Sequence, residues 1–247
     1  MINLLIPKST NMLRKISLAL ILLVSASACK IFDYIPTGPI APTELEISQA
    51  LKEALQISIQ NAVSRSSKED GFFANPKIRI PFPPEAQRAA STLRDLGMGM
   101  VVDNFVETMN HGAEKAAAKA TPIFKNAITS MTIADVYGIY KGDEDAATRY
   151  LRSRTSNQLR SAFRPEIDNS LQTVGITKYW EPVVSTYNKI PFVDPIETDL
   201  SEYVMNRTLD GLFKLMAEEE AKIRQDPAAR VTLLLERVFG YQGSTES

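Results

Sequence analysis

The sequence predicts an all-α protein, a single globular multi-helix bundle of about nine helices with two proline-rich extended loops. Apolar residues recur at helical spacing along most of the chain, and helix caps punctuate this pattern, whereas the alternation typical of strands is almost absent. The chain is 44% hydrophobic and 23% charged, which is ordinary for a globular protein. With one cysteine it can form no internal disulfide, so an extensive apolar core must stabilise the fold.

The N-terminal stretch has the three parts of a secretory signal. Arg14 and Lys15 are cationic, 16–24 is an apolar run, and 25–28 are small residues before a cleavage point. The run is far shorter than the ~20 residues of a membrane-spanning helix. We expect residues 1–28 to be a signal peptide, with Met12 as an alternative start.

Cys29, the only cysteine, follows this signal directly. The segment from Ala26 to Cys29 resembles a bacterial lipobox, in which the cysteine is lipidated, although Ala26 replaces the usual large aliphatic residue. The same residues suit ordinary signal peptidase, which would leave a free N-terminal thiol. We favour lipidation, because a sole cysteine at the cleavage point is hard to obtain by chance. Lys30, rather than Asp, then predicts an outer-membrane lipoprotein; the alternative is a soluble periplasmic protein.

Residues 29–42 contain three prolines and predict a linker after the lipidated cysteine. A capping box, Thr43 with Glu46, predicts the start of the first helix and of a helical domain over 43–240. Residues 241–247 predict a disordered tail.

The segment Asp70–Pro84 contains four prolines and interrupts the helical pattern. Ile78, Ile80 and Phe82 alternate with polar or proline positions, so we expect an extended segment that covers a helix surface. The alternative is a pairing site for a partner strand. Arg79–Phe82 and Lys189–Phe192 share the pattern basic-Ile-Pro-Phe. This repeat indicates either a duplicated helical unit or the same loop-to-helix connection used twice.

Cap, glycine and proline signals divide the rest of the chain into further helices. Asp199 with Glu202 forms a second start that resembles a capping box. We expect Pro165 to end the helix that precedes it. The expected helices are 85–96, 101–120, 122–131, 133–140, 143–163, 166–174, 177–188, 199–225 and 227–239.

Several segments together resemble the bacterial domain of unknown function 4197 family (DUF4197), over about 45–240. They are ALKEAL at Ala50–Leu55, DGFFANPKIRIPFP at Asp70–Pro83, TPIF at Thr121–Phe124, SMTIADVYGIYKGDEDAATRYLR at Ser130–Arg152, YNKIPFVDP at Tyr187–Pro195 and LDGLFKLMAEEEAKIRQDPAARVTLLLERVFG at Leu209–Gly240. The resemblance implies an exported helical protein, often a lipoprotein. It implies no established activity, cofactor or catalytic residue.

His111 is the only histidine, and it shares a helix face with Asp103, Glu107 and Glu114. A helical di-metal site needs a Glu-x-x-His from each of two helices, so one histidine cannot complete it. The sequence also has no Walker loop, dinucleotide glycine pattern, HExxH or CxxC. We therefore expect a solvated polar face, with no catalytic residue, cofactor or metal.

Five arginines occur between 149 and 164 with no acid among them. One interpretation is a solvated face with ion pairs, such as Asp145 with Arg149. The other is an anion-binding surface, for example for a lipid head group. Its candidate residues are Arg149, Arg152, Arg160 and Arg164, and Arg152 with Arg154 could also reach buried carboxylates.

Two further clusters have structural interpretations. Glu218, Glu219 and Glu220 predict a paired surface stripe, in which Glu218 pairs with Lys222 and Glu220 with Arg224 at four-residue spacing. The aromatic residues Tyr179, Trp180, Tyr187 and Phe192 favour core over the alternative of a ligand box.

Three functions remain open. The first is a non-enzymatic, membrane-tethered binding or scaffold protein of the cell envelope, with an envelope protein or anionic lipid as partner. The second is a carrier with an apolar cavity between helices, and an enzyme ranks last. Removing residues 1–28 takes the formal charge from -1 to -4, since the segment carries three cations and no acid; this argues against nucleic-acid binding.

Overall fold

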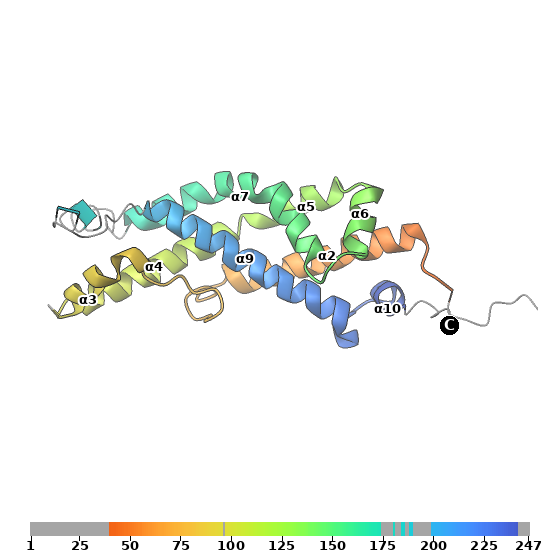
Figure 1. The fold of residues 1–247 in the computed structure, drawn as a ribbon, viewed down its shortest axis with the longest axis horizontal. Coiled ribbons are helices and arrows are strands. Elements are labelled where there is room, and N and C mark those ends of the chain that lie inside the picture. Colours follow the sequence, from red (N-terminus) through yellow and green to blue (C-terminus); the bar gives the residue numbers. More distant parts are fainter. Residues whose placement is uncertain are drawn as a thin grey trace, which may run out of the picture. The chain divides into compact units, whose positions relative to one another are not determined.

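The computed structural model describes residues 40–95, 97–173, 180, 184–185, 188–189 and 199–241 (Figure 1). This part of the chain is helical and contains no strand, so the predicted fold class is confirmed. Its α-helices are α2 (Glu44–Ser67), α3 (Gln87–Asp95), α4 (Gly99–Ala117), α5 (Ala120–Thr129), α6 (Ile133–Tyr140), α7 (Ala146–Thr173), α9 (Leu200–Gln225) and α10 (Leu233–Phe239). Short 3-10 helices, Pro84–Ala86 and Pro227–Ala229, precede α3 and α10.

The helix starts follow the side-chain caps that the sequence predicts. The Thr43 hydroxyl accepts a hydrogen bond from the Glu46 amide at 3.2 Å, and the Glu46 carboxylate accepts one from the Thr43 amide at 2.8 Å. Asp199 likewise accepts from the Glu202 amide at 3.0 Å. These caps satisfy amides that the first turn of a helix leaves without a partner.

The expected helix end at Pro165 is wrong, because α7 continues through this residue to Thr173. Leu159, Phe163, Ile167 and Leu171 are fully buried at four-residue spacing on both sides of the proline. Pro165 itself is exposed. Proline removes one hydrogen bond, whereas packing of an apolar face supplies most of a helix's stability in a protein. The expected helix 177–188 lies largely outside the described residues.

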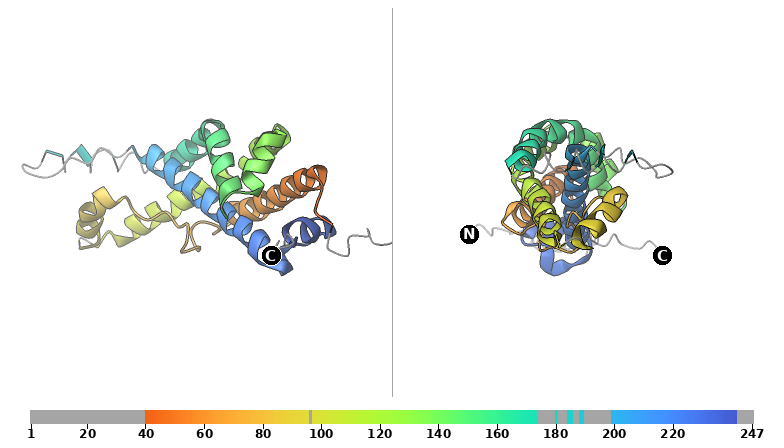
Figure 2. Two further views of the ribbon diagram at one scale, coloured as in Figure 1. Left: turned by 45° about the vertical axis from the view of Figure 1, so that its right-hand side comes forward. Right: turned by 90° about the vertical axis from the view of Figure 1, so that its left-hand side faces the viewer.

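The core of residues 42–241, one compact unit, is built on four long helices. α9 contacts α2, α4 and α7, and α4 also packs along α7, while α5 contacts α2 and α7 (Figure 2). Phe124 on α5 and Phe213 on α9 are both fully buried, and their rings meet edge to face at 5.7 Å. The described helices therefore share one apolar core.

The proline-rich loop after α2 packs onto this core. Ile78, Ile80 and Phe82 are buried and the intervening Arg79 and Pro81 are exposed, so the predicted alternation is confirmed. The loop approaches α9 closely at Gly211, where a Cβ would lie 2.8 Å from the Phe72 ring. The second such loop and the proposed duplication lie largely outside the described residues.

Candidate functional site

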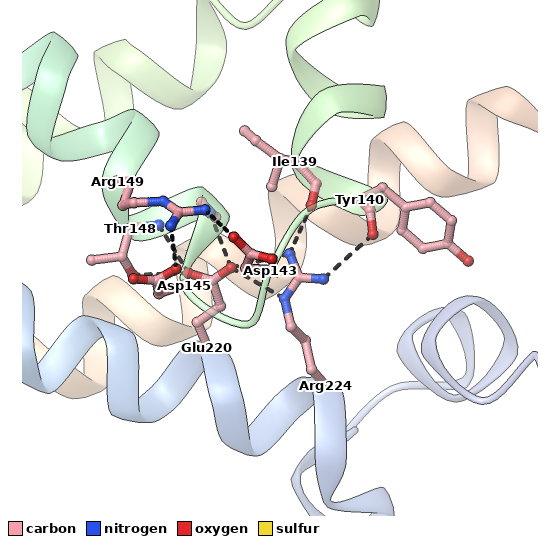
Figure 3. A network of polar contacts seen from close by, with 9 residues as sticks. Ile139, Tyr140, Asp143, Asp145, Thr148, Arg149, Glu220 and Arg224 are labelled. Atoms are coloured by element: carbon pink, nitrogen blue, oxygen red, sulfur yellow. Dashed lines mark hydrogen bonds and ion pairs between the residues drawn. The ribbon is translucent and has the colours of Figure 1, made fainter.

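A buried network joins α9 to the ends of two other helices (Figure 3). The Glu220 carboxylate accepts hydrogen bonds from the Ala147 amide at 3.0 Å and the Thr148 amide at 2.8 Å. Both amides belong to the first turn of α7, where backbone N–H groups lack helical partners and the helix dipole favours an anion. Glu220 therefore caps α7 from a neighbouring helix.

Arg224, one turn later on α9, completes this network. Its guanidinium donates to Glu220 at 3.1 Å and to the Ile139 carbonyl oxygen near the end of α6 at 2.9 Å. Its side chain is 13% exposed and that of Glu220 is 7% exposed. The pair thus provides hydrogen-bond partners for a carbonyl oxygen at the end of α6 and for two amides at the start of α7. Both charges therefore stabilise the fold.

Two buried side chains of α4 hold the proline-rich loop. Glu114 accepts hydrogen bonds from the amides of Phe72 at 3.0 Å and Phe73 at 3.2 Å. Asn110 accepts from the Ile80 amide and donates to the Ile80 carbonyl oxygen, both at 2.8 Å. Since Ile80 already has partners for both backbone groups, the geometry favours loop cover over partner-strand pairing at this residue.

The residues expected to share a face with His111 have different roles. Asp103 is exposed and pairs with Arg94 at 2.6 Å. The expected solvated polar face is wrong for Glu114, because the proline-rich loop buries it. The His111 Nε2 atom lies 3.8 Å from Asp70 and 3.9 Å from Glu114. Within the described residues, no three His, Cys, Asp or Glu side chains come together as metal ligands.

The expected surface stripe of Glu218, Glu219 and Glu220 is wrong for its last two members, which are buried. Glu218 pairs with Lys77 at 2.9 Å, whereas Lys222 pairs with Glu219 at 2.6 Å. The predicted pair of Glu220 with Arg224 is confirmed. The burial arises because α9 crosses α2 and α7 at this point.

Glu219 lies among hydrogen-bond donors from α2 and α9. Asn61 and Arg65 each donate to it at 2.9 Å. Burial acts to raise the pKa of Glu219, but the hydrogen bonds from Lys222 and Asn61 outweigh it, together with the charges of Lys222 and Arg65. The pKa therefore lies below the ordinary 4.5.

This lowered pKa predicts a pH-dependent stability contribution. A carboxylate whose pKa is depressed by folding stabilises the fold above its unfolded pKa, and the contribution is lost as the pH falls through the folded pKa. We expect the stability difference between wild type and Glu219→Gln to be constant above pH 4.5 and to shrink below it. Urea unfolding of both proteins from pH 7 to pH 3 measures this difference, and a constant difference throughout would contradict it.

The four arginines proposed to bind an anion each lie against acids of the same chain. Arg149 pairs with Asp143 at 2.7 Å and Arg152 with Asp210 at 2.9 Å. Arg160 and Arg164 both pair with Glu202, at 2.5 and 2.8 Å. This geometry favours the ion-pair interpretation of the cluster.

These pairs connect α7 mainly to α9. Hydrogen bonds from Arg160, then Arg164, lower the pKa of Glu202 despite the opposing effect of its burial. Arg152 also lies over the Phe213 ring at 4.6 Å. The carboxylate that pairs with Arg152, Asp210, is exposed, and Arg154 lies 4.0 Å from Asp135, which is not fully buried. Neither arginine therefore reaches a buried carboxylate, contrary to the expectation.

Trp180 is buried, as the core interpretation predicts. Its ring lies 5.9 Å from that of Phe82 and 5.5 Å from that of Phe105. Cys29, the proposed signal and the proposed linker up to residue 39 lie outside the described residues. Among the helices that are described, none combines the length and apolarity needed to cross a bilayer.

The hollows of the described part differ in lining. The gap between Leu51, Leu55 and Phe239 is apolar but holds only about 10 Å³. A hollow of about 510 Å³ beside α5, α6 and α7 is lined equally by polar and apolar surface, and its residues include Asp135 and Arg154. Ligand pockets for apolar molecules are typically roughly 300–1,000 Å³ and mostly apolar. The first hollow is far too small for such a ligand, and the second is not mostly apolar. A hollow of about 540 Å³ beside α9 has a largely apolar surface but is bordered by Asp143, Lys214 and Glu218, so these hollows leave the carrier function open.

Another hollow, of about 180 Å³, lies where the proline-rich loop meets α9. Its lining includes Lys77 and Arg79 from the loop and Arg207, Asp210 and Lys214 from the helix. These cations form no cluster in the sequence, because they come from two segments far apart in the chain.

A family model described as "Protein of unknown function (DUF4197)" matches residues 41–240. Neither the curated proteins nor the solved structures contain a match to the chain.

Proposed function

The chain belongs to the DUF4197 family of proteins of unknown function, and from this premise we propose that it is a non-enzymatic, membrane-tethered binding or scaffold protein of the bacterial cell envelope. The observation that carries the proposal is that the buried acids accept hydrogen bonds within the fold. Glu114, Glu219 and Glu220 are the carboxylates that the described part buries, and each accepts bonds from backbone amides or neighbouring side chains. They act as structural anchors, which leaves recognition to the surface.

The tether rests on the sequence before the helical unit. Cys29 directly follows the apolar run and small residues of a secretory signal. Two lipid chains suffice for stable membrane attachment, so an acylated Cys29 would anchor firmly. The linker, residues 30–42, would then separate the helical unit from the membrane, with Lys30 favouring the outer membrane.

Metabolic labelling with a fatty acid tests the tether. We expect the wild-type chain to incorporate label and to fractionate with membranes, and Cys29→Ala to lose both properties. The variant removes the only thiol and leaves the helical unit unchanged. An unlabelled wild-type chain would instead make the protein soluble and periplasmic.

Affinity purification of the tethered chain, with mass spectrometry of both proteins and lipids, tests the binding role. Specific recovery of an envelope protein or anionic lipid supports it. Recovery of an apolar lipid in fixed stoichiometry after delipidating washes would favour the carrier instead. Recovery of neither would count against both functions.

A further inference from the structure

The hollow at the junction of the proline-rich loop and α9 has an excess of positive charge. Four of its charged lining side chains, Lys77, Arg79, Arg207 and Lys214, are cations, and one, Asp210, is an acid. The whole chain, in contrast, has a formal charge of -1. Such a concentration of one sign in a concave site attracts oppositely charged ligands.

Ion pairs account for only part of this charge. Asp210 is held by Arg152 at 2.9 Å, and Lys77 by Glu218 at 2.9 Å. Arg79, Arg207 and Lys214 have no carboxylate within 4.0 Å among the residues that the structure describes. The charge of Arg79 nevertheless helps to lower the pKa of Asp103, after the larger effects of Arg94, and Lys214 also borders a hollow whose lining includes Asp143 and Glu218. The hollow thus differs from α7, where the arginines proposed to bind an anion are matched by acids.

Aromatic rings and backbone contacts position these three cations. The Arg79 guanidinium lies over the Phe73 ring at 4.5 Å, and that of Arg207 over the Tyr203 ring at 5.6 Å. The Lys214 ammonium donates to the Lys77 carbonyl oxygen at 3.2 Å and retains further donors. Side chains supported in this way lose less freedom on binding a ligand.

The loop that carries Arg79 is also fixed from beneath. The Ile80 backbone is bonded on both sides to Asn110, and the amides of Phe72 and Phe73 to Glu114. The Tyr203 hydroxyl donates to the Pro81 carbonyl oxygen at 3.1 Å. The two walls of the hollow are therefore held together by hydrogen bonds.

We propose that this hollow binds a phosphate-type oxyanion, either a free phosphate or the phosphate head group of an anionic lipid. Arginine presents planar, forked donors that match phosphate oxygens, and lysine adds a point charge. A volume of about 180 Å³ is below that of typical drug-sized pockets, roughly 300–1,000 Å³, and suits a compact anion. The site supplies a ligand for the proposed binding role but does not depend on the tether at Cys29.

Isothermal titration calorimetry with inorganic phosphate tests the site on the full chain, expressed with its own leader and purified in a non-ionic detergent. We expect wild-type binding that weakens with salt. Arg79→Gln/Arg207→Gln should reduce the affinity by about tenfold or more, since the loss of a single charged hydrogen bond already costs about that factor. Both side chains are exposed, so the fold should persist, and a thermal melt checks this.

A matched control separates the site from general charge. Lys125→Gln/Lys141→Gln removes the same charge at exposed positions outside the hollow and should change the phosphate affinity by less than about twofold. Asp210→Asn removes the acid of the hollow and should strengthen binding. Equal weakening by the two double variants, or absence of wild-type binding both here and in the vesicle assay, would overturn the proposal.

Vesicles distinguish the two sources of phosphate. The partition coefficient of the protein is measured with phosphatidylglycerol vesicles and with phosphatidylcholine vesicles. An acyl anchor contributes to both coefficients, so its contribution cancels in their ratio. A ratio that falls in Arg79→Gln/Arg207→Gln but not in the lysine control supports a lipid head group. Phosphate binding with an unchanged ratio supports a free phosphate. Failure in both arms rejects the site, whereas unlabelled Cys29 would reject only the tether.

Discussion

Replacing Glu220 by alanine is expected to lower the free energy of unfolding by about 3–5 kcal/mol, the cost of breaking a buried ion pair from one side. The substitution leaves the Arg224 guanidinium, 13% exposed, without its carboxylate partner. It also removes the acceptor for the Ala147 and Thr148 amides. One change therefore affects the end of α6, the start of α7 and their contact with α9.

Urea denaturation of wild type and Glu220→Ala measures this loss. Glu218→Ala is the matched control, because it removes the same side chain two positions earlier on α9. Glu218 has one ion pair, with Lys77, whose side chain is 57% exposed, so we expect a loss of about 0–1 kcal/mol. Equal losses in the two variants would contradict the structural role of Glu220.

The three consecutive glutamates illustrate what helical periodicity can predict. The pair of Glu220 with Arg224 follows from four-residue spacing alone, and the structure contains it. The burial of Glu219 and Glu220 depends on where α2 and α7 cross α9. That information lies in distant segments, so the local sequence could not separate buried from exposed members of the cluster.

Pro165 shows a similar conflict between local and tertiary signals. A proline predicts a helix end, yet Phe163 and Ile167 continue one apolar face across it. The four-residue spacing of that face was present in the sequence and would have indicated a continuous helix. The caps at Thr43 and Asp199 involve only local bonds, which is why they were predictable.

The candidate site was harder to predict than the fold for the same reason. The arginines of α7 attract attention because they are dense in the sequence, but acids of α9, such as Glu202 and Asp210, lie beside them. Arg79 and Arg207 are isolated in the sequence, and only the packing of the loop on α9 brings them to one hollow. Local charge density is therefore a poor guide to which cations remain available for a ligand.

Asn110→Ala is expected to lower the free energy of unfolding by about 2–6 kcal/mol. Both backbone groups of Ile80 would lose their partner while remaining buried, and each such group costs roughly 1–3 kcal/mol. Asn104→Ala, on the exposed side of the same helix, is the control and should cost less than about 1 kcal/mol. Urea denaturation measures both losses, and similar values would contradict the anchoring role.

The same substitution connects stability to the proposed site. Asn110 holds the loop residue next to Arg79, so its loss should release Arg79 from a fixed position over the Phe73 ring. Hydrogen exchange at the Ile80 amide should accelerate in Asn110→Ala and remain slow in Asn104→Ala. If phosphate binding then weakens although both arginines are present, the hollow depends on a loop held in place by α4. If phosphate binding is unchanged although the Ile80 amide exchanges faster, the cations do not need the hydrogen bonds from Asn110 to bind phosphate.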